Sequence, residues 1–110
     1  MTPLPLPLPV ERAMSKLGRD ISLARRRRQL TQASLAERIG ASLATVRRME
    51  KGDPHIALHF VARTLHVFGE LDRLTLLLDT AEDQIGLSLM DEQLPKRVRM
   101  RQPHDQSGAL

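Results

Sequence analysis

The apolar residues of the chain recur every three or four positions over most of its length, which is the spacing of amphipathic helices. This periodicity predicts five helices, over residues 15–29, 32–38, 43–50, 57–68 and 70–78. The residues spaced to face a shared core in the first three are Leu17, Ile21, Ala24, Leu35, Ala36, Ile39, Val46 and Met49. The pattern therefore predicts an all-α fold of five helices.

Residues that start and stop helices stand between these segments. Thr31 and Ser42 each precede a helical pattern, where a hydroxyl can cap the first turn. Gly40 can end the second helix in a left-handed turn, and the small Ala36 allows the second and third helices to approach closely. The run from Lys51 to Pro54 breaks the third helix.

Both ends of the chain depart from the helical pattern. Leucine and proline alternate from Pro3 to Pro9, so residues 1–13 are expected to form a flexible, polyproline-like arm. The arm is either a docking segment for a partner or a disordered leader. Residues 79–94 fit a short helix or a strand, and residues 95–101 form a basic tail.

The net charge of +4 is unevenly distributed along the chain. Residues 11–51 carry 11 Lys/Arg against 4 Asp/Glu, residues 52–94 carry 2 against 8, and residues 95–110 carry 4 against 1. A basic first half suits a surface that faces phosphates, and an acidic second half suits a partner or dimer face. The alternative is solvated charge without a function.

The composition excludes several classes of function. Without cysteine, the chain has no disulfide framework, thiolate zinc site or cysteine nucleophile. Phe60 and Phe68 are the only aromatic residues, too few to stack successive single-stranded bases, so duplex DNA is the favoured nucleic acid. No apolar stretch approaches the roughly 20 residues that span a bilayer. A cytoplasmic protein without membrane contact is therefore expected.

Side chains with catalytic or metal-binding chemistry do not converge on one site. His55 and His59 stand four residues apart, but no cysteine or carboxylate completes a metal-ligand set with them. The adjacent carboxylates Glu82 and Asp83 point in different directions on any regular element, as at a turn or a helix start. We expect no enzyme, no metal and no cofactor.

Residues 31–52, TQASLAERIGASLATVRRMEKG, resemble the helix-turn-helix of the lambda/434-repressor-like (Cro-like, or XRE) family. The similarity extends over about residues 15–80 and implies a five-helix DNA-binding domain with a flexible N-terminal arm and a basic C-terminal tail. It divides the chain into the arm (1–13), the helix-turn-helix domain (14–80) and a dimer- or partner-binding segment with the tail (81–110).

The resemblance also implies which residues contact double-stranded operator DNA. Those expected near the bases are Leu43, Ala44, Thr45 and Arg48, and those expected near the DNA backbone are Gln32, Ser42 and Arg47. Apolar side chains at Leu43 and Ala44 suit thymine methyl groups, and Arg48 suits a bidentate contact to guanine. The alternative is that Arg48 meets only phosphate.

Four consecutive arginines, Arg25 to Arg28, end the first helix. Four consecutive residues cover all faces of a helix, so at least one arginine must turn inward. The resemblance implies that Arg25 pairs with Glu50 and locks the third helix against the first. The other arginines are either phosphate clamps or solvated charges.

Residues 85–89 and 94–99 look similar to the C-terminal portion of HipB-like antitoxins. This likeness implies a homodimer that represses its own operon and binds a HipA-like serine/threonine kinase toxin. The alternative is a stand-alone XRE-family regulator without a toxin partner. Leu71, Leu74 and Leu78 form one stripe on the fifth predicted helix, which is either core or the seam of the dimer.

Overall fold

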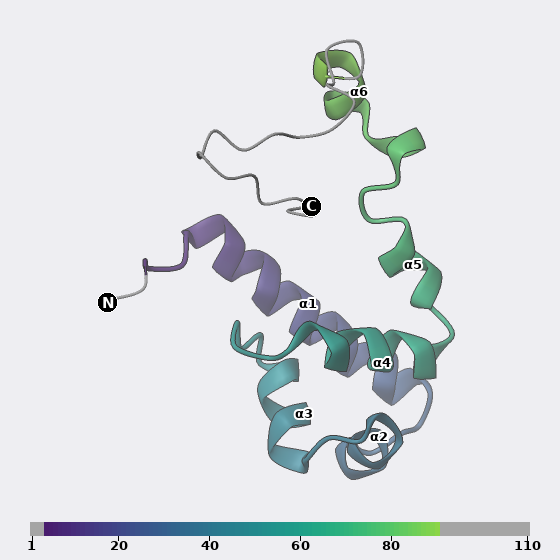
Figure 1. The fold of residues 1–110 in the computed structure, drawn as a ribbon. Coiled ribbons are helices and arrows are strands. Elements are labelled where there is room, and N and C mark those ends of the chain that lie inside the picture. The colour runs from purple at the N-terminus through teal and green to yellow at the C-terminus, as the bar shows by residue number, and fades with distance from the viewer. Residues whose placement is uncertain (1–3, 91–110) are drawn as a thin grey trace, which may run out of the picture. The chain divides into compact units, whose positions relative to one another are not determined.

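The computed structural model describes residues 4–90, and within this range all regular secondary structure is helical. The helices are α1 (Leu8–Arg27), α2 (Gln32–Ile39), α3 (Leu43–Glu50), α4 (Leu58–Phe68), α5 (Leu71–Thr75) and α6 (Gln84–Met90), with a 3-10 turn, η1, over Thr80–Glu82 (Figure 1). The all-α prediction is therefore confirmed. A sixth helix adds to the five expected, and it forms where the sequence left a helix or a strand open.

The segments α2 and α3 begin and end as the capping residues predict. The Thr31 hydroxyl accepts a hydrogen bond from the backbone N–H of Ser34 at 3.0 Å, and the Ser42 hydroxyl accepts one from Thr45 at 3.1 Å. Both bonds satisfy N–H groups that have no partner within the helix. Gly40 ends α2 with φ at 71°, a left-handed conformation that favours glycine.

The N-terminal arm is shorter than predicted. α1 begins at Leu8, so the expected flexible arm over residues 1–13 is wrong from Leu8 onward. Proline at the second helical position removes an N–H that has no partner in the helix, so Pro9 is compatible with a first turn. Pro7 precedes the helix with an extended backbone, at φ −58° and ψ 142°.

The leucine stripe of the fifth predicted helix is also shorter in the structure. α5 ends at Thr75, not at Leu78, and the Thr75 hydroxyl donates to the Asp72 carbonyl at 2.8 Å. Such local bonds compete with continuation of a helix. Leu71 and Leu74 are half-buried, whereas Leu78 lies beyond the helix and is 82% exposed.

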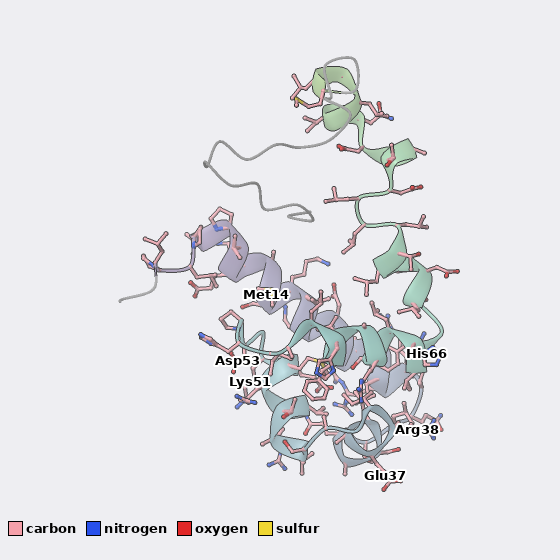
Figure 2. The ribbon with its side chains drawn as sticks, in the orientation of Figure 1. Met14, Glu37, Arg38, Lys51, Asp53 and His66 are labelled. Carbon is pink, nitrogen blue, oxygen red and sulfur yellow. The ribbon has the colours of Figure 1, made fainter. Side chains whose placement is uncertain are left out.

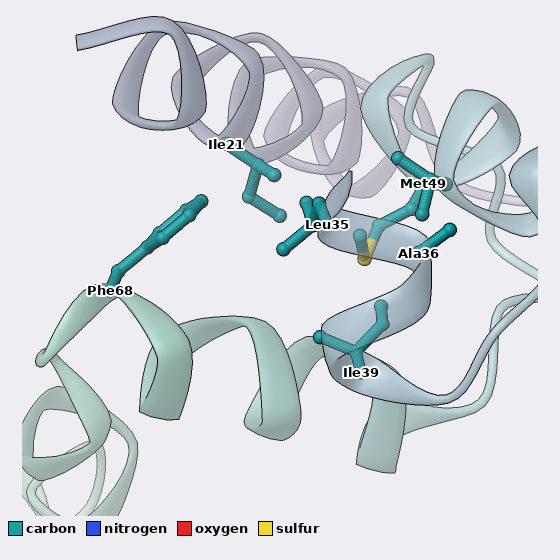
Figure 3. Close-up of a cluster of buried hydrophobic side chains, with 7 residues drawn as sticks. Ile21, Leu35, Ala36, Ile39, Met49 and Phe68 are labelled. Carbon is teal, nitrogen blue, oxygen red and sulfur yellow. The ribbon is translucent and has the colours of Figure 1, made fainter. Parts of the chain in front are cut away.

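Helices α1 to α4 share one hydrophobic core. Its buried members are Ile21 from α1, Leu35, Ala36 and Ile39 from α2, Val46 and Met49 from α3, and Phe68 from α4. In Figure 3 the Phe68 ring points toward Ile21 across the core, and Met49 lies next to Ala36. Seven of the eight predicted core residues are buried or half-buried, but Leu17 is 38% exposed and that prediction is wrong.

Two arginines satisfy carbonyl groups at the C-terminal ends of neighbouring helices. Arg28 donates to the Phe68 carbonyl at 3.1 Å and lies over the Phe68 ring, 4.7 Å from its centre. Arg63 on α4 donates to the Ile39 carbonyl at 3.1 Å. Arg28 therefore has a structural role, joining the end of α1 to α4.

The described residues fall into two units, one up to Thr75 and one from Leu76. In the second unit the Asp83 carboxylate accepts from the Gly86 backbone N–H at 2.9 Å and caps α6. The apolar side chains of this helix, Ile85, Leu87, Leu89 and Met90, are all exposed. The predicted tail over residues 95–101 lies outside the described residues. Among residues 4–90, no helix has the length and apolar character needed to cross a membrane.

Candidate nucleic-acid interface

A tight turn at Gly40 and Ala41 sets the geometry between α2 and α3. The Gly40 N–H donates to the Glu37 carbonyl at 3.3 Å, and the Ala41 N–H donates to the Ala36 carbonyl at 2.9 Å. These paired bonds form the Schellman motif that often ends a helix. Figure 1 looks along α2 and shows α3 from the side, so the two helices cross steeply.

α3 has one buried face and one exposed face. Val46, Met49 and Glu50 are buried against the rest of the domain. The outward face carries Ala44, Arg47, Arg48 and, directly after the helix, Lys51. These four residues follow the spacing of one helix face, so three positively charged side chains share the outward face of α3. An exposed basic helix of this kind suits the negatively charged groove of duplex DNA.

A buried ion pair holds the inner face of α3 to α1. Arg25 Nε donates to Glu50 Oε2 at 2.6 Å, and Arg25 Nη2 donates to Glu50 Oε1 at 3.1 Å. Arg25 Nη1 also donates to the Leu30 carbonyl at 2.8 Å. The pair that the family resemblance implied is therefore confirmed, and its bidentate geometry holds the C-terminal end of α3 against α1.

Two glycines allow α1 and the end of α3 to pack backbone against backbone. A side chain at Gly18, in the middle of α1, would place its Cβ 2.6 Å from the Glu50 carbonyl oxygen and 2.7 Å from the Gly52 nitrogen. A Cβ at Gly52, where φ is 81°, would lie 2.7 Å from the Cα of Ser15. All three distances are too short for a side chain, so the close approach requires glycine at both positions.

The structure places the seven predicted contact residues in two groups. Ser42, Ala44, Arg47 and Arg48 are exposed, whereas Gln32, Leu43 and Thr45 are half-buried. The Thr45 and Ser42 hydroxyls lie 2.9 Å apart. The Gln32 amide donates to Glu50 Oε1 at 3.0 Å, which orients Gln32 through the buried ion pair.

Lys51 belongs to the outward face but was not among the predicted contact residues. Its position, seven residues after Ala44, would have indicated this, because residues seven apart lie on one face of a helix. Lys51 was left out because the predicted helix ends at residue 50, before the helix-breaking run from Lys51 to Pro54. In the structure the last turn of α3 carries the helical geometry through Lys51, whose φ is −89° and ψ −2°.

The turn after α3 brings a carboxylate close to Arg48. Arg48 Nη1 lies 3.7 Å from Asp53 Oδ2, and Asp53 Oδ1 accepts from the His55 backbone N–H at 2.8 Å. That backbone hydrogen bond, aided by the His55 ring and by Arg48, lowers the pKa of Asp53. In Figure 2 Lys51 and Asp53 lie on this turn, near Met14 of α1.

The histidines do not assemble a metal site in the described part of the chain. His55 Nδ1 faces Asp53 Oδ1 at 3.2 Å. The His59 ring lies beside the Phe60 ring, with 4.2 Å between the ring centres and an angle of 43° between the ring planes. Among the described residues, no three histidine, cysteine, aspartate or glutamate side chains lie together as metal ligands would.

Two short helices, a tight glycine turn and an exposed basic face on the second helix define a helix-turn-helix DNA-binding domain. The chain belongs to the family of helix-turn-helix domains, whose model matches residues 16–78. No curated protein and no solved structure matches the chain significantly. The family match supports the XRE-like assignment, and the likeness to HipB-like antitoxins stays a prediction.

Proposed function

We propose that the chain is a sequence-specific transcriptional repressor that binds duplex DNA by placing α3 in the major groove. The observation that carries this proposal is the outward face of α3, where Arg47, Arg48 and Lys51 lie together. The opposite face is held by the Arg25–Glu50 ion pair. The basic side chains attract the phosphates, and the buried ion pair holds the helix in one orientation, so that it can keep a fixed register on the bases.

Within this face the residues have different roles. Arg48 contacts a guanine edge with two parallel hydrogen bonds, and Ala44 contacts a thymine methyl group, with Leu43 and Thr45 beside them. Arg47, Ser42 and Gln32 contact the DNA backbone. The Gln32–Glu50 hydrogen bond supports this role for Gln32, because it orients the side chain before DNA arrives.

The test of DNA binding is selection of duplexes from a random library with the full chain, followed by titration of the selected duplex at several salt concentrations. We expect a shared sequence among the selected duplexes and an affinity that falls with salt, with a slope of about −0.9 per phosphate contact. Absence of salt-sensitive binding to any duplex would contradict the proposal.

The repressor acts as a homodimer, since one helix contacts too few base pairs for a tight site and two-fold symmetry doubles them. Leu76, Leu77 and Leu78 are exposed and offer an apolar surface for a second copy. Leu77→Glu should convert the dimer to a monomer, as measured by light scattering. Because Leu77 is 71% exposed, this substitution spares the core, unlike one at the half-buried Leu74.

The finer role that we propose is that of an antitoxin in a type II toxin-antitoxin system, with a HipA-like kinase as partner. The sequence likeness over residues 85–89 supports this role, and so does the exposed apolar surface of α6. Co-expression with the product of the neighbouring gene tests it. A stable complex that still binds promoter DNA is the expected result, and no complex would favour the stand-alone regulator.

A further inference from the structure

We propose that Asp53 is a specificity-determining residue, which weakens contacts of Arg48 with phosphates of any sequence while leaving its contact with the cognate base. This inference rests on the proposed function, in which α3 binds duplex DNA. It concerns a carboxylate in the turn after the helix, outside the set of residues that contact DNA.

The carboxylate of Asp53 is held in place by the turn that follows α3. Asp53 Oδ1 accepts from the His55 N–H at 2.8 Å, and the Asp53 N–H donates to the Arg48 carbonyl at 3.1 Å. The side chain is 23% exposed, compared with 55% for Arg48. The negative charge is therefore held by the turn, while the guanidinium that faces it is more exposed to solvent.

The distance between the two groups indicates electrostatic attraction without a direct hydrogen bond. Arg48 Nη1 and Asp53 Oδ2 lie 3.7 Å apart, too far for a hydrogen bond but close enough for electrostatic attraction. The other donors of the guanidinium remain available, because arginine carries five N–H groups in a fork. The structure assigns none of these other donors to Asp53.

A nearby carboxylate affects the two kinds of DNA contact differently. A phosphate carries a full negative charge and binds arginine through charge-assisted hydrogen bonds. The adjacent carboxylate repels that charge and reduces the net charge of the pair. A guanine edge is neutral and binds the guanidinium through two directed hydrogen bonds, which the carboxylate leaves intact. Asp53 therefore raises the ratio of specific to non-specific affinity by penalising the wrong contact.

Asp53→Asn tests this role because an asparagine oxygen can still accept the hydrogen bond from His55, so the turn is kept while the charge is removed. Asp20→Asn is the matched control. Asp20 also faces a basic side chain, with 2.6 Å to Lys16 Nζ, but it lies on α1, and its substitution changes the net charge by the same amount.

The measurement compares a duplex selected from a random library by the unmodified chain with a scrambled duplex of equal length. For Asp53→Asn we expect affinity for the scrambled duplex to rise about two- to fivefold, as for one exposed charge pair. Affinity for the selected duplex should rise less. The salt slope on the scrambled duplex should steepen by up to about 0.9, equivalent to one added phosphate contact.

The inference is overturned if Asp53→Asn changes both duplexes by the same factor, if it leaves both unchanged or weakens them, or if Asp20→Asn has the same effect. These outcomes differ from failure of the proposed function. In that case the unmodified chain would select no duplex and show no salt-sensitive binding.

Discussion

α3 and α6 are helices of similar length, with eight and seven residues, and each begins with a polar side chain that accepts a backbone hydrogen bond. They differ in what covers their apolar side chains. Val46 and Met49 of α3 are buried, whereas every apolar side chain of α6 is exposed within the described part of the chain. Two capped helices of similar length therefore differ, because the apolar side chains of α3 are part of a core and those of α6 are exposed.

The difference shows what local sequence does and does not determine in a short helix. Isolated helices of this length are marginal in water, so caps and propensity alone do not stabilise them. α3 is stabilised by α1 and α2, through the core, the buried ion pair and the glycine contact. The apolar side chains of α6 have no such support within the described part of the chain.

The largest effect is expected from breaking the ion pair that holds α3. Glu50→Gln leaves the buried Arg25 charge without its carboxylate, which should lower the free energy of unfolding by about 3–5 kcal/mol. Urea denaturation followed by circular dichroism measures this change. Glu37→Gln, at an exposed position of α2, is the control and should have little effect. A loss below about 1 kcal/mol for Glu50→Gln would show that the pair does not hold α3.

The next largest effect is expected at the backbone contact between α1 and the end of α3. Gly18→Ala inserts a methyl group against the Glu50 carbonyl, and overpacking of this kind costs about 1–3 kcal/mol. Thermal or urea unfolding measures the effect. In an exposed helix the same substitution would stabilise by about 1 kcal/mol, so a gain in stability would contradict the close packing of α1 and α3.

A smaller effect is expected from removing the caps, and here the two helices should respond differently. Ser42→Ala should lower the global free energy of unfolding by about 1 kcal/mol, because α3 is part of the core. Asp83→Ala removes the corresponding cap of α6 and should reduce helical content without shifting the global midpoint. Equal shifts of the midpoint would mean that α6 unfolds together with the domain.

The smallest effect on stability is expected on α6 itself. Ile85 is 75% exposed, so Ile85→Ser should change the free energy of unfolding by less than about 0.5 kcal/mol in dilute protein. The same substitution should weaken the binding of any partner that covers the helix, as measured by co-purification. A loss of several kcal/mol in the isolated chain would show that Ile85 is already buried.

The elements with strong local signals were predicted well from the sequence. The bounds of α3 and the caps at Thr31 and Ser42 were correct, because capping and left-handed turns depend on nearby residues. The start of α1 was missed because the alternation of leucine and proline up to Pro9 indicates an extended arm, although Val10, Met14 and Leu17 have helical spacing. The Arg25–Glu50 pair came from family resemblance, since two residues 25 apart give no local signal.

The candidate site was only partly predictable. The basic outward face of α3 follows from helical spacing. The close packing at Gly18 and the position of the Asp53 carboxylate beside Arg48 depend on how the chain folds. The sequence shows that a glycine or a carboxylate is present, but it does not show which atoms lie next to it in the folded chain. The assignment of individual residues to bases or phosphates remains a prediction.

The central claim is that the outward face of α3 reads DNA sequence, and paired substitutions on that face test it most directly. Affinities of Arg48→Ala and Arg47→Ala for a selected and a scrambled duplex should be measured at one salt concentration. Arg48→Ala should lower the preference for the selected duplex about tenfold, within the 1–3 kcal/mol of one bidentate base contact. Arg47→Ala should weaken both duplexes by the same factor. Weakening of both duplexes by the same factor in Arg48→Ala, or unchanged binding by both variants, would contradict the claim.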